Sequence, residues 1–182
     1  MSYSITPESA EGATPETDPV KLEQLMRAKR EEQSLTLAIF GGLLASVVAA
    51  IIWAAITYAT SYQIGFMAIG VGVLVGYAVN YFGKGMTVTF GVVGAAFALF
   101  GCLFGNLLTD FIVLSQQEDS SIGLVLGAYL SSPVIIVEIM KETFSPIDLL
   151  FYAIAIFQGF KLSYGHLTEE ELASIQKHPS AQ

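Results

Sequence analysis

Apolar residues occur in four long runs that are separated by short polar breaks. A helix needs about 20 predominantly apolar residues to cross the hydrocarbon core of a bilayer. We therefore predict an all-α integral membrane bundle of four antiparallel transmembrane helices, because the first three runs are joined by tight connections. The predicted spans cover about residues 35–60, 64–82, 86–114 and 147–164.

The segment 115–144, between the third and fourth runs, does not follow this pattern. It holds a polar stretch and two apolar stretches, 122–130 and 134–140, that are each too short to cross a bilayer. We predict a partly helical outer loop whose short helices lie on the membrane surface or at the mouth of the bundle. The alternative is a re-entrant hairpin over 121–143, which needs protein or water around its non-helical backbone.

Polar segments flank the four runs. Residues 1–17 predict a disordered tail because they are polar and contain two prolines. Residues 18–34 predict an amphipathic helix, either cytoplasmic or at the membrane interface. Residues 165–182 predict a cytoplasmic tail with a short helix over about 169–177. Gly165 is placed to cap the fourth span, and Thr168 and Glu171 are spaced for a capping box.

The distribution of charge sharpens this picture. Only 13% of the 182 residues are charged, whereas a typical globular chain has about 25%. Residues 35–114 contain two charged residues, Lys84 and Asp110. A soluble domain needs a charged exterior, so this distribution excludes a water-soluble enzyme. The net charge of −8, with eight basic residues spread along the chain, excludes a nucleic-acid partner.

Basic residues near the ends of spans predict the orientation, because they stay preferentially in the cytoplasm. Four of these basic residues precede the first run. Two others, Lys161 and Lys177, lie near the end of the fourth run and after it. With four spans and a cytoplasmic N-terminus, only Lys141 falls outside. We therefore expect a multi-pass protein of the cytoplasmic membrane with both termini in the cytoplasm and an acidic outer mouth.

Glycines are the strongest internal signal of helix packing. Gly72 and Gly76 are four residues apart in the second run, and Gly101 and Gly105 are four apart in the third. Small residues at this spacing let transmembrane helices approach closely. These faces could pack the bundle internally, or one of them, such as the face of Gly72 and Gly76, could bind another subunit.

Three polar residues inside the runs are the other candidates, because polar groups are costly in lipid. Asn106 and Asp110 are four residues apart and therefore share a helix face. Together with Asn80 they could line a narrow polar path with Asp110 as a cation site. Equally, each could form a hydrogen bond between helices.

Motifs that would indicate an enzyme are absent from the sequence. One cysteine, Cys102, and two histidines, His166 and His178, have no metal-ligand spacing. We therefore expect no catalytic residue, no cofactor and no metal.

Three segments resemble recurring segments of an uncharacterised family of small four-span proteins of the bacterial inner membrane. They are Gly65–Val79, Phe90–Leu107 and Thr143–Ser163. The resemblance covers about residues 35–172 and implies a bacterial inner-membrane location. It carries over no catalytic residue.

These observations favour a non-enzymatic membrane protein that acts as a scaffold or accessory subunit of a membrane assembly. Its expected partners are the lipid bilayer and either a second copy or another membrane protein. The alternative is a small channel or transporter with a polar path near Asn80, Asn106 and Asp110.

Overall fold

The computed structural model describes residues 17–60, 65–117 and 145–176, except residue 166, with isolated positions between 127 and 141. The described residues contain six helices and no strand beyond an isolated bridge, which confirms the all-α fold class. The chain divides into two compact units. One is Glu32–Gly165, and the other is formed by the N-terminal segment up to Glu31 together with the C-terminal segment that follows Gly165. The tail predicted over 1–17 lies outside the described residues except for Thr17. Most of the segment 115–144 also lies outside the described residues. The structure therefore does not distinguish surface helices from a re-entrant hairpin in this segment.

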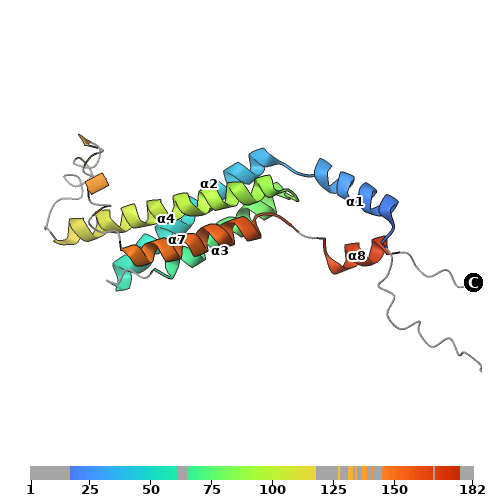
Figure 1. Ribbon diagram of the computed structural model, residues 1–182. Helices are drawn as coiled ribbons and strands as arrows, with labels where there is room; N and C mark the ends of the chain where they lie inside the picture. The colour runs from blue at the N-terminus through green and yellow to red at the C-terminus, as the bar shows by residue number, and fades with distance from the viewer. Residues whose placement is uncertain are drawn as a thin grey trace, which may run out of the picture. The chain divides into compact units, whose positions relative to one another are not determined.

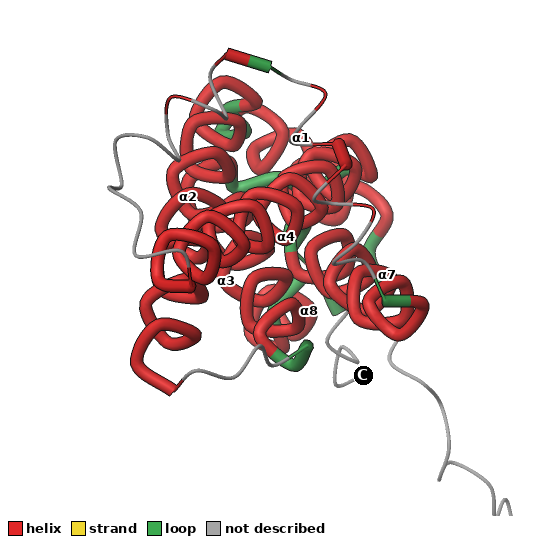
Figure 2. Tube along the Cα trace, turned by 90° about the vertical axis from the view of Figure 1, so that its left-hand side faces the viewer, coloured by secondary structure: helices red, strands yellow, loops and turns green. Residues whose placement is uncertain are grey.

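Four helices pack side by side in the unit Glu32–Gly165, as Figures 1 and 2 show. Among the described helices, α3 and α4 contact each other and both outer helices, while α2 and α7 do not touch. The α3–α4 pair therefore separates α2 from α7. These helices are α2 (Leu35–Thr60), α3 (Met67–Gly83), α4 (Val88–Gln117) and α7 (Pro146–Leu162).

The helix bounds differ from the predicted ranges in specific places. Helix α2 coincides with the first run, but α3 begins at Met67 rather than 64 because Gly65 and Phe66 form a turn. Helix α4 begins two residues later and ends three residues later than predicted. Helix α7 ends at Leu162, so Gly165 does not cap it as expected.

Backbone hydrogen bonds define one end of this unit. The Ser34 N–H donates to the Gly83 carbonyl at 3.0 Å, and the Gly165 N–H donates to the Gly85 carbonyl at 2.8 Å. The start of α2, the α3–α4 turn and the end of α7 therefore meet. It follows that consecutive helices are antiparallel, and that the end of α4 and the start of α7 both lie at the opposite end.

The α3–α4 turn is held by Lys84, whose backbone is left-handed with a φ of 47°. Its N–H donates to the Asn80 carbonyl at 2.7 Å, which closes the C-terminus of α3. Its ammonium lies 3.3 Å from the Glu32 carboxylate, and both side chains are largely exposed. The turn thus ties the start of α2 to the end of α3.

Large and small side chains are distributed in an unusual way over α2. Its buried residues are mostly alanine, glycine and serine, with Trp53 the large exception. Its large aliphatic and aromatic side chains point outward; Phe40 is 66% exposed and Leu44 is 62% exposed. By length and composition, α2 and Val88–Val113 of α4 could each cross a membrane, and α3 is a shorter apolar helix, among the described residues.

The terminal segments form the second unit, from α1 (Pro19–Glu31) and α8 (Glu169–Ile175). The Asp18 N–H donates to the Ile175 carbonyl at 2.8 Å, and Thr17 forms an antiparallel bridge with Gln176. Asp18 also caps α1, because its carboxylate accepts from the Val20 N–H at 3.0 Å. The N-terminal and C-terminal segments are therefore partners, which their separation in the sequence conceals.

Candidate functional site

The first candidate is the pair of glycines on α3. A Cβ added to Gly72 would lie 2.4 Å from the Ala155 carbonyl oxygen and 2.8 Å from the Ala155 Cα. A Cβ added to Gly76 would lie 2.7 Å from the Cβ of Leu162. Real Cβ atoms do not approach this closely, so both positions must be glycine for α7 to lie where it does. This face of α3 packs closely on α7, so it is not available to another subunit.

Gly101 and Gly105 of α4 face α2 and α3 rather than α7. A Cβ at Gly101 would lie 2.7 Å from the Val71 side chain and 3.2 Å from the Ser46 Cβ. A Cβ at Gly105 would lie 3.0 Å from the Trp53 ring. Gly105 therefore accommodates the one large side chain that α2 buries. This face of α4 packs on α2 and α3.

The sequence reasoning missed a second close approach between backbones, which joins α4 to α7. A Cβ at Gly94 would lie 2.4 Å from the Gly159 carbonyl oxygen, and a Cβ at Gly159 would lie 2.7 Å from the Gly94 carbonyl oxygen. Neither glycine has another glycine four positions away, but Ala98 follows Gly94 at that spacing and Ala155 precedes Gly159 at the same spacing. Glycine and alanine together were the signal that could have found this contact.

These contacts give the four helices a core of small residues. Ala38, Ala68, Ala98 and Ala155 have no exposed surface. Close approach increases dispersion contacts between backbones, which is the main force that joins helices in lipid. The arrangement can therefore hold helices together without a hydrophobic core of large side chains.

The second candidate is a buried polar cluster formed by Asn106, Asp110 and Tyr152. Asn106 is 9% exposed and Asp110 is 7% exposed, so both side chains are buried within the unit. The Asn106 side-chain amide donates to the hydroxyl oxygen of Tyr152, a residue of α7. Tyr152 was not among the predicted residues. This cluster joins α4 to α7 near the end of the unit opposite the α3–α4 turn.

Asn80 does not join this cluster. It lies in the last turn of α3, next to the start of α4, whereas Asn106 lies 18 residues after Val88. At 1.5 Å per residue this separates the two levels by about 27 Å along α4. Of the buried residues between the two levels, Val75 and Val79 are apolar and have no exposed surface. Ser46 of α2 is also buried there, and its hydroxyl donates to the Leu43 carbonyl of its own helix at 2.8 Å. The structure thus brings two of the three predicted polar residues together and places the third at the other end.

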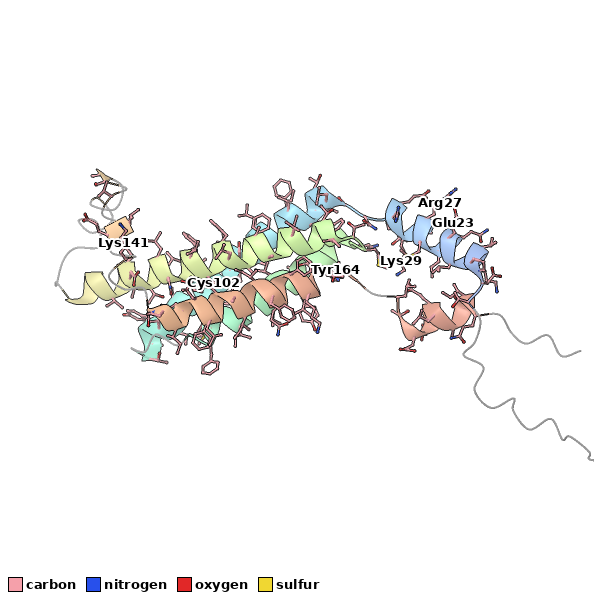
Figure 3. The ribbon with its side chains drawn as sticks, in the orientation of Figure 1. Glu23, Arg27, Lys29, Cys102, Lys141 and Tyr164 are labelled. Carbon is pink, nitrogen blue, oxygen red and sulfur yellow. The ribbon has the colours of Figure 1, made fainter. Side chains whose placement is uncertain are left out.

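Cys102 lies part-way along α4, one turn before Asn106 (Figure 3). Its sulfur is 4.0 Å from the Ala68 carbonyl oxygen of α3, and the side chain has no exposed surface. This is the environment of a small buried hydrophobe. Among the described residues, no three His, Cys, Asp or Glu side chains are grouped so that they could hold a metal ion.

A shallow groove of about 220 Å³ lies between α2 and α3. Apart from Trp53, its lining side chains carry no group that forms a strong hydrogen bond, and it includes none of the predicted polar residues. The lining residues are Ala49, Ile52, Trp53, Met67, Gly70, Val71 and Leu74.

Comparison with known proteins adds no assignment to these sites. No family model, no curated protein and no solved structure matches the chain.

Proposed function

We propose that the chain is a non-enzymatic, multi-pass membrane protein that crosses the bilayer with α2, α3, α4 and α7 and acts as a scaffold or accessory subunit. The observation that carries this proposal is the distribution of side-chain size, with small residues inside and large apolar ones outside. In water such an arrangement would expose far more contiguous apolar surface than a soluble monomer carries. In lipid it costs nothing, since the acyl chains solvate the outward side chains.

The connectivity supports four crossings with both termini on one side. The start of α2 and the end of α7 meet at the α3–α4 turn, which holds the basic residue Lys84. Basic residues favour the cytoplasm, so this end is the cytoplasmic end of the proposed topology. A crossing by 118–144 would bring the chain back at the wrong end for α7. The proposed location is the bacterial inner membrane.

The internal contacts favour a scaffold over a channel. Asn106 bonds to Tyr152 on a neighbouring helix. Between the levels of Asn106 and Asn80, Val75 and Val79 are fully buried, and the buried Ser46 hydroxyl bonds within its own helix. A conduction path needs polar or wetted surface along its whole length. The polar pair therefore supports a role in anchoring α4 to α7, and a path past Asn80, Asn106 and Asp110 is the weaker proposal.

The test is affinity purification from native membranes with gentle detergent, followed by native mass spectrometry. The scaffold proposal predicts a reproducible complex, with a second copy or another membrane protein. The Gly72→Leu variant should lose this complex, because leucine displaces α7. The matched Gly70→Leu variant should keep it, since a Cβ at Gly70 meets nothing within 4 Å. A preparation that contains only monomer would remove the scaffold proposal.

Ion flux into proteoliposomes tests the channel alternative. The scaffold proposal predicts no flux above that of empty liposomes. A flux that the Asp110→Asn variant abolishes would instead establish the polar path.

A further inference from the structure

Helix α1 has one face that combines apolar and basic residues. Leu22, Leu25, Met26 and Lys29 follow the i, i+3, i+4, i+7 spacing, and all four are half-buried. The remaining basic residues, Lys21, Arg27 and Arg30, are exposed. At 100° per residue, Lys21 and Arg30 lie on either side of the half-buried stripe. Basic residues that flank an apolar stripe are typical of a helix that lies on an anionic membrane surface.

In this structure α8 interacts with that same face. The Lys29 ammonium lies 2.6 Å from Oε1 of Glu171. The other carboxylate oxygen, Oε2, accepts the Thr168 N–H at 3.0 Å and so completes the capping box of α8. Glu171 is one of three consecutive glutamates in the first turn of α8. It therefore presents to Lys29 the same chemistry as an anionic headgroup.

The chain connection places α1 close to the proposed membrane surface. Three residues, 32–34, separate the end of α1 from the first residue of α2. If α2 spans the bilayer from Leu35, a fully extended connection of this length reaches only about 10 Å. Helix α1 is therefore held at high effective concentration near lipid headgroups.

We propose that α1 has two mutually exclusive partners: α8, as in this structure, and the anionic lipid surface next to α2. Glu171 and the anionic headgroups compete for Lys29. This inference rests on the proposed membrane location. Removal of the Glu171 charge would release Lys29 and move the equilibrium toward lipid. The loss of one surface ion pair changes the ratio of the two populations by up to about fivefold.

The experiment uses the full chain in nanodiscs, with spin labels on α1 and α8. Ala28→Cys and Ala173→Cys provide exposed positions away from the half-buried stripe, in a Cys102→Ala background. Double electron–electron resonance then measures the distance between α1 and α8 in zwitterionic phosphatidylcholine and in phosphatidylcholine mixed with anionic phosphatidylglycerol. Glu171→Gln is the test variant. Glu23→Gln is the matched control, because it removes the same charge from an exposed pair with Arg27 (Figure 3).

The proposal predicts one short distance in zwitterionic discs and an additional long distance in anionic discs. Glu171→Gln should raise the ratio of long to short populations by up to about fivefold in anionic discs, and Glu23→Gln should match the parent. The proposal is overturned if the distances do not depend on lipid charge, or if Glu171→Gln leaves the ratio of long to short populations in anionic discs unchanged. It is also overturned if Thr168→Ala, which removes the cap and keeps the Lys29 pair, reproduces the effect. Failure of the chain to enter nanodiscs would instead remove the proposed membrane location, and this inference with it.

Discussion

The contact between α3 and α7 at Gly72 allows a sharp test of glycine-mediated packing. The change is Gly72→Ala, which adds one methyl group. That methyl carbon would lie 2.4 Å from the Ala155 oxygen, and the nearest other atoms, also backbone, would lie 2.8 Å and 2.9 Å away. Backbone cannot rotate away as a side-chain tip can, so α7 must move.

The size of the effect follows from the required displacement. Ordinary van der Waals contact begins at about 3.4 Å, so the two helices must separate by about 1 Å. A gap of 0.5–1 Å removes about a quarter to a half of the dispersion energy of each atom pair across it. Overpacking of this kind typically costs about 1–3 kcal/mol. We expect Gly72→Ala to lie in the upper half of that range.

Gly70→Ala is the matched control, two residues earlier on α3 and open to its surroundings. It should be neutral or stabilising by about 0.5–1 kcal/mol, because alanine restricts the unfolded chain more than glycine does. Denaturation by SDS in mixed micelles measures both variants. Trp53, the single tryptophan of the chain, is 3% exposed and reports unfolding by its fluorescence. Equal stability of the two variants would refute the packing argument.

Three further changes probe other parts of the structure. Lys84→Gly should leave the free energy of unfolding unchanged or raise it by about 1 kcal/mol in the same assay. Glycine adopts the left-handed conformation at this position without strain, and the variant loses only an exposed ion pair with Glu32. A clear loss of stability would contradict this expectation. Tyr152→Phe should lower the free energy of unfolding by about 1–3 kcal/mol, because the Asn106 amide loses its acceptor. A double-mutant cycle with Asn106→Leu should show an interaction energy between the two residues. Strictly additive effects would contradict the hydrogen bond. Hydrogen bonds from Lys29 and then from the Thr168 amide lower the pKa of Glu171 below its ordinary range. Its stabilisation of the α1–α8 contact is therefore complete above the pKa of a glutamate in the unfolded chain and is lost as the pH falls through the lower pKa of the folded state. The spin-label distance should lengthen only below the ordinary titration range of a glutamate, and lengthening between pH 7 and 5 would disagree with this assignment.

The sequence predicted the helices well because their boundaries depend on local chemistry. The uncharged run over 35–60 is helical throughout as α2. The capping box of Thr168 and Glu171 formed as its spacing indicated. The start of α3 was predicted too early because apolar residues at 64–66 continue the hydrophobic pattern through a turn. Hydropathy does not register a turn made of apolar residues.

Contacts between helices could be predicted only in part. The spacing of Gly72 and Gly76 identified a close-approach face, but periodicity within one helix does not name the partner. The pairing of Gly94 with Gly159 joins helices whose sequences share no repeat, and the Lys29–Glu171 pair joins opposite ends of the chain. Both depend on the three-dimensional arrangement alone.

The polar residues show the same limit. Helical spacing placed Asn106 and Asp110 on one face, which the structure bears out in a shared buried location. It did not reveal Tyr152, because a tyrosine in an apolar run is indistinguishable from an interfacial aromatic residue. Asn80 lies far from Asn106 and Asp110 because it sits at the opposite end of the antiparallel helices α3 and α4. Spacing within one helix does not give this distance.

The central claim is that four helices cross a membrane and return both termini to one side, and cysteine accessibility in intact cells tests it most directly. Single cysteines at exposed positions, in a Cys102→Ala background, would be treated with an impermeant maleimide before and after permeabilisation. The proposed topology predicts that Phe66→Cys and Ser145→Cys react from outside, whereas Val20→Cys, Lys84→Cys and Ala173→Cys react only after permeabilisation. Labelling of Val20 and Ala173 from opposite sides, or of Lys84 from the same side as Phe66, would contradict it.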